Sequence, residues 1–331
     1  MDSSSLSDKL AGADLPVDLL QKVQDQLTHS SSNYEMVSKY VDWITHLPWH
    51  KESTTPLDIN KTKELLDKSH FGLTEIKLRV LEYLSVLILQ HKNGQKINHS
   101  PILFFVGLAG TGKTSFSESV ARSLNRPFVR IPFGGLANIY DIRGMSKAQN
   151  EAEAGMIIKA MRTAGVKNPV ILLDELDRIS PEAKSGIMGV LIELLDPEQN
   201  NHFIDRYIDY PFDLSQVFFI ATANNTNEIS TAVLDRLEVI QMPSYSDEEK
   251  IIIAKNFLLP NLIAENGMKD ISLKIDDAVW EHIARLSGYD PGIRSVERKI
   301  ETIVRKVALQ DVLGKGNSYT VNEENMGQWG I

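Results

Sequence analysis

The segment Gly107-Leu108-Ala109-Gly110-Thr111-Gly112-Lys113-Thr114 has the glycine, lysine and hydroxyl residues of a phosphate-binding P-loop at the required spacing. It follows an apolar run at residues 102–106 and precedes a helix-like pattern, which is the strand–loop–helix context that the motif needs. Backbone N–H groups of such a turn bind phosphate oxygens, Lys113 would contact the β- and γ-phosphates, and Thr114 would ligate Mg²⁺. These residues predict a nucleoside triphosphate site; the alternative is a glycine-rich turn without a ligand.

A pair of carboxylates forms the second candidate group. Residues 170–173 have the pattern of a buried strand and run directly into Asp174 and Glu175. The C-terminal edge of a parallel sheet is where such side chains meet a bound ligand. Asp174 is predicted to hold the metal through water, and Glu175 to orient and activate the attacking water. The alternative, a solvated acidic turn, is disfavoured by the P-loop upstream.

The composition is that of an ordinary globular protein of 331 residues, long enough for about two domains and an appendage. A net charge of -9 and a pI near 5.5 do not favour binding to nucleic acid or to anionic membranes. The absence of cysteine excludes disulfides, thiolate metal sites and a cysteine nucleophile. With no bilayer-length apolar span and no targeting signal, we expect a soluble intracellular protein, its compartment open among cytoplasm, mitochondrial matrix and peroxisomal matrix.

The periodicity of apolar residues predicts the elements that position these groups. Helical spacing within residues 15–46 predicts two helices in an N-terminal helical segment, residues 1–56. Two further helices, separated by a break at 70–73, precede five strand-like runs that alternate with helical segments. The runs lie at residues 102–106, 128–131, 170–173, 217–222 and 239–241. This rhythm predicts a parallel sheet wound with helices, an α/β nucleotide-binding domain over residues 57–243.

The remaining residues are predicted to form a small all-helical subdomain, residues 244–315. Its helical patterns lie at residues 247–265, 276–287 and 293–313. Residues 316–331 are predicted to be a tail with one short strand at 318–321.

Several stretches resemble the Lon protease family of AAA+ ATPases, in the family's order and spacing. They are Val41-Asp42-Trp43-Ile44 with Leu47-Pro48-Trp49, the box at residues 67–73, Val166-Lys167-Asn168-Pro169, Leu195-Asp196-Pro197-Glu198-Gln199-Asn200, and Leu234-Asp235-Arg236 with Glu238. The resemblance covers nearly the whole chain. It implies a P-loop AAA+ core with a five-stranded parallel sheet, a helical lid, and binding of ATP with Mg²⁺.

The resemblance also implies roles for single residues. His70, Phe71 and Gly72 match the family's box beside the adenine. Asn224, at the end of the fourth strand, matches the sensor-1 position that fixes the attacking water beside Glu175. By residue type alone, Asn224 is equally compatible with a turn or a helix cap.

Two arginines match further catalytic positions of the family. Arg236 matches the arginine finger that reaches the γ-phosphate of the neighbouring subunit; the alternative is a surface ion pair. Arg294 matches sensor 2, which reports the nucleotide state to the lid; the alternative is a solvated arginine in the first turn of a helix. A finger that acts in trans implies a homo-oligomeric ring, by resemblance a hexamer.

By this resemblance the chain is an ATP-hydrolysing motor that drives unfolding and translocation of misfolded or damaged proteins. The family places a Ser–Lys proteolytic dyad after the lid, and the chain ends before such a domain could begin. We therefore expect no peptidase active site in this chain, and a protease domain or subunit as a further partner.

Two segments depart from the family's pattern. In the first pore segment, residues 147–155, Gln149 stands where the family has its gripping tyrosine, although the spacing between Gly144 and Gly155 is preserved. A polar amide lacks the apolar surface of a tyrosine ring. In the second pore segment, residues 183–187, Ala-Lys-Ser-Gly-Ile replaces the family's Met-Arg-Gly-Asp-Pro.

These departures keep a second function open: a non-proteolytic Lon-like ATPase that acts as a chaperone, remodeller or regulatory ring subunit without threading its partners. DNA-acting AAA+ clamp loaders and initiators are disfavoured. They share the motor motifs, but not the tryptophan-bearing N-terminal stretch or the segment at residues 195–200.

Overall fold

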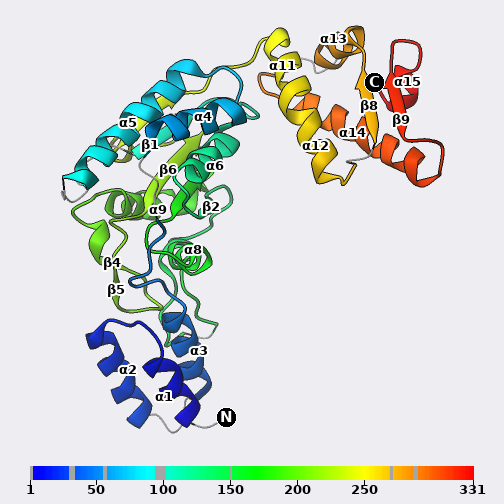
Figure 1. Cartoon of the computed structure of the whole chain (residues 1–331). Coiled ribbons are helices and arrows are strands. Elements are labelled where there is room, and N and C mark those ends of the chain that lie inside the picture. Colours follow the sequence, from blue (N-terminus) through cyan, green and yellow to red (C-terminus); the bar gives the residue numbers. More distant parts are fainter. Residues whose placement is uncertain are drawn as a thin grey trace.

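The computed structural model describes residues 3–29, 34–54, 58–93, 102–149, 151–268, 271–285 and 290–331. Three parts follow one another along an elongated molecule: N-terminal helices, a central α/β domain, and a C-terminal subdomain at the opposite end (Figure 1). The predicted boundary between residues 56 and 57, Asn150 of the first pore segment, and the predicted helix end at 286–287 lie outside the described residues. Within the described chain, no helix is both long enough and apolar enough to cross a membrane.

The central domain is built on a sheet of five parallel strands. They are β1 (Ile102–Val106), β2 (Phe128–Pro132), β3 (Val170–Asp174), β6 (Phe218–Ala223) and β7 (Leu237–Gln241), in the order β2-β3-β6-β1-β7. Every neighbouring pair in this sheet is parallel. The prediction of a five-stranded parallel α/β core is confirmed.

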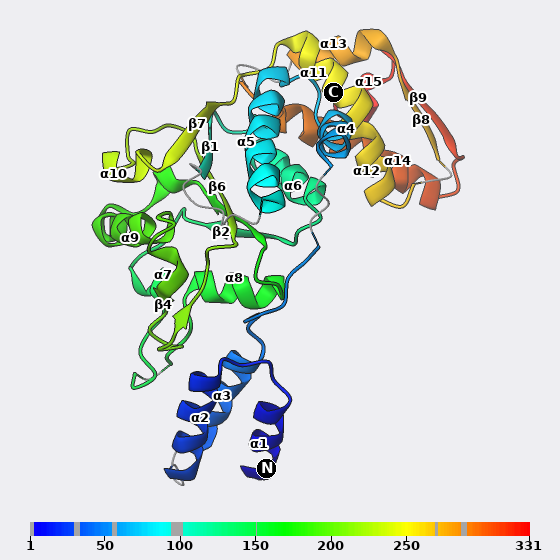
Figure 2. The same cartoon turned by 60° about the vertical axis from the view of Figure 1, so that its left-hand side comes forward.

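Helices cover both faces of the sheet, because the strands send alternate apolar side chains to opposite sides. Phe105 packs with α4 (Ile59–Ser69), α5 (Thr74–Lys92) and α6 (Lys113–Ser123). Phe104 packs on the other face, with α8 (Met156–Ala164) and α9 (Pro181–Leu194). The carboxyl ends of all five strands therefore meet at one edge, where the P-loop begins (Figure 2).

Short elements connect the strands of the central domain. They are α7 (Tyr140–Arg143), the 3₁₀ turns η1 (Leu176–Arg178) and η2 (Asn200–His202), the antiparallel hairpin of β4 (Phe203–Ile204) and β5 (Pro211–Phe212), and α10 (Thr231–Leu234). The hairpin lies toward the N-terminal helices in both views (Figures 1 and 2).

The N-terminal part has three helices where the sequence predicted two: α1 (Ser3–Ala11), α2 (Val17–His29) and α3 (Tyr34–Thr45). The first was missed because its sequence is mostly serine and charged residues, with Leu6 and Leu10 as its buried apolar residues. These helices join the core of the central domain, since their apolar residues belong to the same buried cluster as Phe104. The Tyr40 hydroxyl also donates a hydrogen bond to the Ile208 carbonyl at 2.8 Å.

The C-terminal subdomain is not all-helical, so that prediction is wrong. Its helices are α11 (Asp247–Ile253), the π-helical turn η3 (Ala254–Leu258), α12 (Leu259–Glu265), α13 (Asp277–Arg285), α14 (Arg294–Val312) and α15 (Met326–Trp329). A two-stranded parallel sheet joins β8 (Ser272–Ile275) to β9 (Ser318–Val321). The pairing is non-local and each strand is short, so local periodicity gave no signal for β8. Because β9 pairs with β8, the short strand predicted in the tail forms part of this subdomain.

Candidate nucleotide-binding site

The P-loop connects β1 to α6 in a conformation that depends on its glycines. Gly110 and Gly112 have φ angles of 84° and 91°, in the left-handed region that favours glycine. A Cβ on Gly107 would lie 2.6 Å from the Met242 carbonyl oxygen, so a larger residue would clash with the chain after β7. Lys113 and Thr114 are the first two residues of α6. The loop thus presents the N-terminus of a helix of 11 residues to the space beside it.

The ammonium group of Lys113 is held within this loop. Its Nζ donates to the carbonyl oxygens of Gly107 at 2.5 Å and Leu108 at 3.0 Å, and to Asn224 Oδ1 at 3.3 Å. Lys113 is buried, and burial lowers its pKa, while the nearby Asp174 carboxylate opposes the shift. A cation in this position can exchange loop carbonyls for phosphate oxygens without leaving the site.

The two acidic residues lie at the carboxyl end of β3 in different environments. Asp174 is buried; its Oδ1 accepts a hydrogen bond from the Thr222 hydroxyl and its Oδ2 one from Arg130 Nε. Glu175 has a left-handed conformation, with φ 60° and ψ 51°, which is uncommon for a residue with a side chain. Its carboxylate is 3.2 Å from Arg178. This conformation ends β3 after Asp174 and begins the turn η1.

Asn224 connects the P-loop to a third carboxylate. Its Oδ1 accepts from Lys113, and its Nδ2 donates to Asp177 Oδ2 at 3.1 Å. The other oxygen of Asp177 is buried and has no hydrogen-bond partner among the described residues. Such an unsatisfied oxygen indicates a site that can accept a further donor. The structure thus brings Lys113, Asn224 and the acidic pair together at one edge of the sheet.

The predicted adenine box lies at the end of α4. His70 Nε2 is 3.1 Å from Ser115 Oγ, and the His70 ring packs edge-on against Phe116 with the centroids 5.2 Å apart. Burial lowers the pKa of His70 to about 4, with smaller contributions from nearby cations. Phe71 and Gly72 follow in the turn before α5, and Gly72 has a φ of 61°. The box therefore borders the first turn of the P-loop helix.

The C-terminal subdomain contacts the P-loop directly. The Ile293 N–H donates to the Gly110 carbonyl at 3.1 Å, which places Arg294 at the first position of α14 beside the loop. Tyr245 adds a second contact, because its hydroxyl donates to the Thr111 carbonyl at 3.1 Å. A rearrangement of the P-loop around phosphate would therefore change these contacts and shift the start of α14.

Arg236 lies elsewhere. It immediately precedes β7, and its carbonyl accepts from Ile102 N at the amino end of β1, whereas the P-loop follows the carboxyl end of β1. Five residues of strand, at about 3.3 Å each, separate the two ends. The Arg236 guanidinium is 3.2 Å from Asp196 and also donates to the Ala232 carbonyl at 2.7 Å. Arg236 therefore does not join the site of its own chain.

The first pore segment is anchored at its base and exposed at Gln149. Buried Asp205 accepts from the Gly155 N–H at 2.7 Å, and added side-chain atoms on Gly144 would lie 2.8 Å from the Asp205 carboxylate. A Cβ on Gly155 would lie 1.9 Å from the Ile142 carbonyl oxygen, so close contacts require glycine at both ends of this spacing. Lys147 Nζ lies 3.7 Å from the centroid of the Tyr40 ring, while Gln149 is exposed. The second pore segment, residues 183–187, lies within α9.

Several residues of the site were missed by sequence reasoning. Thr222 and Asp177 stand close in sequence to predicted site residues, at the end of β6 and just after the acidic pair, and that proximity was an available signal. Arg130 and Tyr245 come from other parts of the chain, and no local motif indicates that they reach the site. No local pattern indicates that Asp205 binds the Gly155 N–H at the base of the first pore segment.

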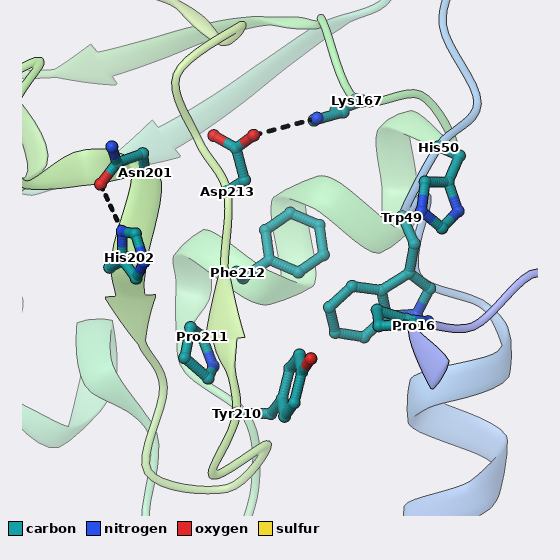
Figure 3. Close-up of a pocket in the computed structure, with 10 residues that line it drawn as sticks. All are labelled: Pro16, Trp49, His50, Lys167, Asn201, His202, Tyr210, Pro211, Phe212 and Asp213. Atoms are coloured by element: carbon teal, nitrogen blue, oxygen red, sulfur yellow. Dashed lines mark hydrogen bonds and ion pairs between the residues drawn. The ribbon is translucent and has the colours of Figure 1, made fainter. Parts of the chain in front are cut away.

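A pocket of about 350 Å³ lies far from these groups, between the N-terminal helices and the β4–β5 hairpin (Figure 3). The Trp49 ring packs against Tyr210 and Phe212, with centroids 5.8 Å and 4.9 Å apart. On the rim, Lys167 and Asp213 form an ion pair at 3.0 Å. No predicted site residue lines this pocket, and the ring contacts of Trp49 anchor the N-terminal segment.

Fold and site together define a P-loop ATPase of the AAA class. The model of the ATPase family associated with various cellular activities (AAA) matches residues 103–245. The model of the Lon protease AAA+ ATPase lid domain matches residues 264–320. The chain belongs to the Lon family, of which it contains the ATPase domain and the lid.

Named relatives agree with this assignment. The Lon protease of Lawsonia intracellularis is 43% identical over 94% of this chain, and the match covers 38% of that protein. Lon protease 2 of Herpetosiphon aurantiacus is 39% identical over 92% of the chain and is covered to 38%. The Lon protease of Heliobacterium modesticaldum is 38% identical over 98% of the chain and is covered to 40%. The chain thus spans about two fifths of the length of these relatives.

Proposed function

We propose that this chain binds ATP with Mg²⁺ and hydrolyses it, as the motor of a Lon-type ATP-dependent protease. The observation that carries the proposal is the convergence of Lys113, Asn224 and the acidic pair at the edge of the sheet where the P-loop begins. Hydroxyl and carboxylate oxygens suit Mg²⁺, and the positive φ angles of Gly110 and Gly112 allow the turn whose N–H groups can bind phosphate.

Each residue has a distinct task in this proposal. Thr114 and Asp174 would hold the metal ion, whose charge neutralises the phosphate oxygens. Glu175 accepts a proton from the attacking water. Asn224 positions that water, and Lys113 binds the β- and γ-phosphates.

The adenine and the lid complete the nucleotide site. We assign His70, Phe71 and Gly72 to the adenine side because this turn borders the first turn of α6. Arg294 is assigned to sensing the nucleotide from the lid, since its neighbour Ile293 is hydrogen-bonded to the P-loop.

Arg236 is proposed to act on a neighbouring copy of the chain. Its position at the amino end of the strands keeps it away from its own P-loop, so it can complete only another subunit's site. This geometry supports a homo-oligomeric ring, which we propose to be a hexamer. Asp196 holds the guanidinium until the neighbour presents a nucleotide.

The proposed substrates are unfolded or misfolded proteins, delivered to a protease domain or subunit. One observation favours the second candidate, a chaperone or regulatory ring subunit that does not thread its partners. Gln149 is exposed in the first pore segment where the family has its gripping tyrosine, and Lys147 packs on Tyr40 of α3 rather than extending outward.

Binding of a fluorescent ATP analogue and release of phosphate test the proposed function together. We expect Lys113→Ala to weaken nucleotide binding at least about tenfold, because a charge-assisted contact to phosphate is lost. Lys315→Ala, which removes an exposed lysine in the lid, serves as the matched control and should bind like the wild type. Equal binding by both variants would contradict the proposed function.

A further inference from the structure

Protein groups already occupy both oxygens of the Asp174 carboxylate. Oδ1 accepts from the Thr222 hydroxyl, and Oδ2 accepts from Arg130 Nε at 2.5 Å. The Asp174 side chain is 4% exposed, so it needs a charged or hydrogen-bonding partner. Within the described part of the chain, Arg130 provides the ion pair to Asp174. The proposed metal-site carboxylate is thus neutralised by the protein itself.

The register of the sheet explains why Arg130 reaches this carboxylate. Arg130 on β2 is paired with Leu172 on β3, two residues before Asp174, so all three project from the same face. The neighbouring Phe128 packs with the apolar cluster on that face, which also contains the P-loop helix α6. The long guanidinium side chain then extends along the face to the carboxyl edge of the sheet.

Arg130 is placed so that it can leave. Its side chain is 50% exposed, although its partner is buried. β2 is an edge strand of the sheet, so no further strand lies beyond it and the Arg130 side chain can move outward. Lys113 differs, because its ammonium is buried in the loop by two carbonyls and Asn224. Lys113 is therefore held in the loop where phosphate would bind, whereas Arg130 can move away from the carboxylate.

We propose that Arg130 is a positioning residue that pairs with Asp174 and is displaced from it when Mg²⁺ and nucleotide bind. A guanidinium on Asp174 cancels the charge that attracts Mg²⁺, and it repels a divalent ion at the same place. Because the Arg130 side chain is half-exposed, water can solvate the guanidinium when it leaves the buried carboxylate. The ion pair therefore raises the Mg²⁺ requirement without preventing binding. The inference rests on the proposed function, since it takes Asp174 as the carboxylate that holds the metal.

A titration of Mg²⁺ against binding of a fluorescent, non-hydrolysable ATP analogue tests this role. We expect Arg130→Gln to lower the Mg²⁺ concentration at half-saturation about tenfold, the size of one charge-assisted hydrogen bond discounted for solvent exposure. In EDTA the variant should bind the analogue no better than the wild type. Arg285→Gln is the matched control, because it removes the same charge from an exposed pair in the lid and should leave the Mg²⁺ requirement unchanged.

An unchanged or higher Mg²⁺ requirement in a folded Arg130→Gln variant would overturn the inference. If that variant does not fold, Arg130→Lys carries the test: it keeps the charge but loses the Nε donor, so a partial decrease supports the role and no decrease overturns it. Wild-type protein that fails to bind the analogue at saturating Mg²⁺ would instead refute the proposed function.

Discussion

The nucleotide site and the first pore segment are both held by a well-defined backbone, yet they differ in the side chains they present. At the nucleotide site, Lys113, Asn224 and Asp177 form a continuous chain of hydrogen bonds between the P-loop, β6 and the turn after β3. At the pore segment, Asp205 and two glycines close the base of the loop, while Gln149 is exposed between them.

The backbone conformation of a loop and the chemistry of its side chains are therefore separable. Gly144 and Gly155 are required by close contacts at the base, so their spacing reports the backbone conformation alone. Gln149 makes no such contact and decides what the loop can grip. We therefore expect mutations at the nucleotide site to change turnover strongly, and mutations at the pore segment to change coupling to a substrate.

We expect the largest loss of ATP turnover from Arg236→Ala, because Arg236 is proposed to complete the nucleotide site of a neighbouring subunit. Arg236→Ala should leave ATP binding nearly intact and lower turnover by about 10³-fold or more, as for arginine fingers in other nucleotide hydrolases. Phosphate release under saturating ATP measures the effect. Mixing the variant with Glu175→Gln subunits should restore part of the turnover, because each provides what the other lacks. Unchanged turnover of Arg236→Ala alone would exclude action in trans.

A smaller effect is expected at the pore segment. Gln149→Tyr should leave the basal ATPase rate within about twofold, because the side chain is exposed and distant from the P-loop. It should increase ATP-dependent unfolding of a tagged globular protein, since an aromatic ring supplies the missing apolar surface. Gln149→Asn is the matched control. Efficient unfolding by the wild-type protein, without gain in the variant, would show that the amide grips adequately.

The smallest effect concerns His70 and pH. Its folded-state pKa of about 4 lies below the ordinary value of 6.5, so the unfolded chain binds more protons between these values. This contribution to the free energy of unfolding is complete above about pH 6.5 and is lost as the pH falls toward 4. Urea unfolding should show that His70→Gln loses about 1 kcal/mol less than the wild type between pH 7 and pH 5. Parallel losses in both proteins would contradict burial of a neutral imidazole.

Residues of the site that belong to local sequence motifs could be predicted, and residues that reach it through non-local contacts could not. The P-loop and the acidic pair each consist of consecutive residues, and the five strands have strong apolar patterns. Local sequence was therefore enough to predict these motifs and strands. Arg130 and Tyr245 reach the site through the register of the sheet and the contact with the lid, which no local pattern specifies. Strand β8 was missed for the same reason, because its partner β9 lies in the last part of the chain.

Single-turnover measurements on Glu175→Gln test whether Glu175 is the general base for ATP hydrolysis. Asp174, Asn224 and Lys113 remain in this variant, so ATP and Mg²⁺ should bind at least as tightly as to the wild type. The bound ATP should stay uncleaved, with phosphate release reduced by at least about 10²-fold because the general base is lost. Wild-type turnover in Glu175→Gln, or loss of its ATP binding, would contradict the account.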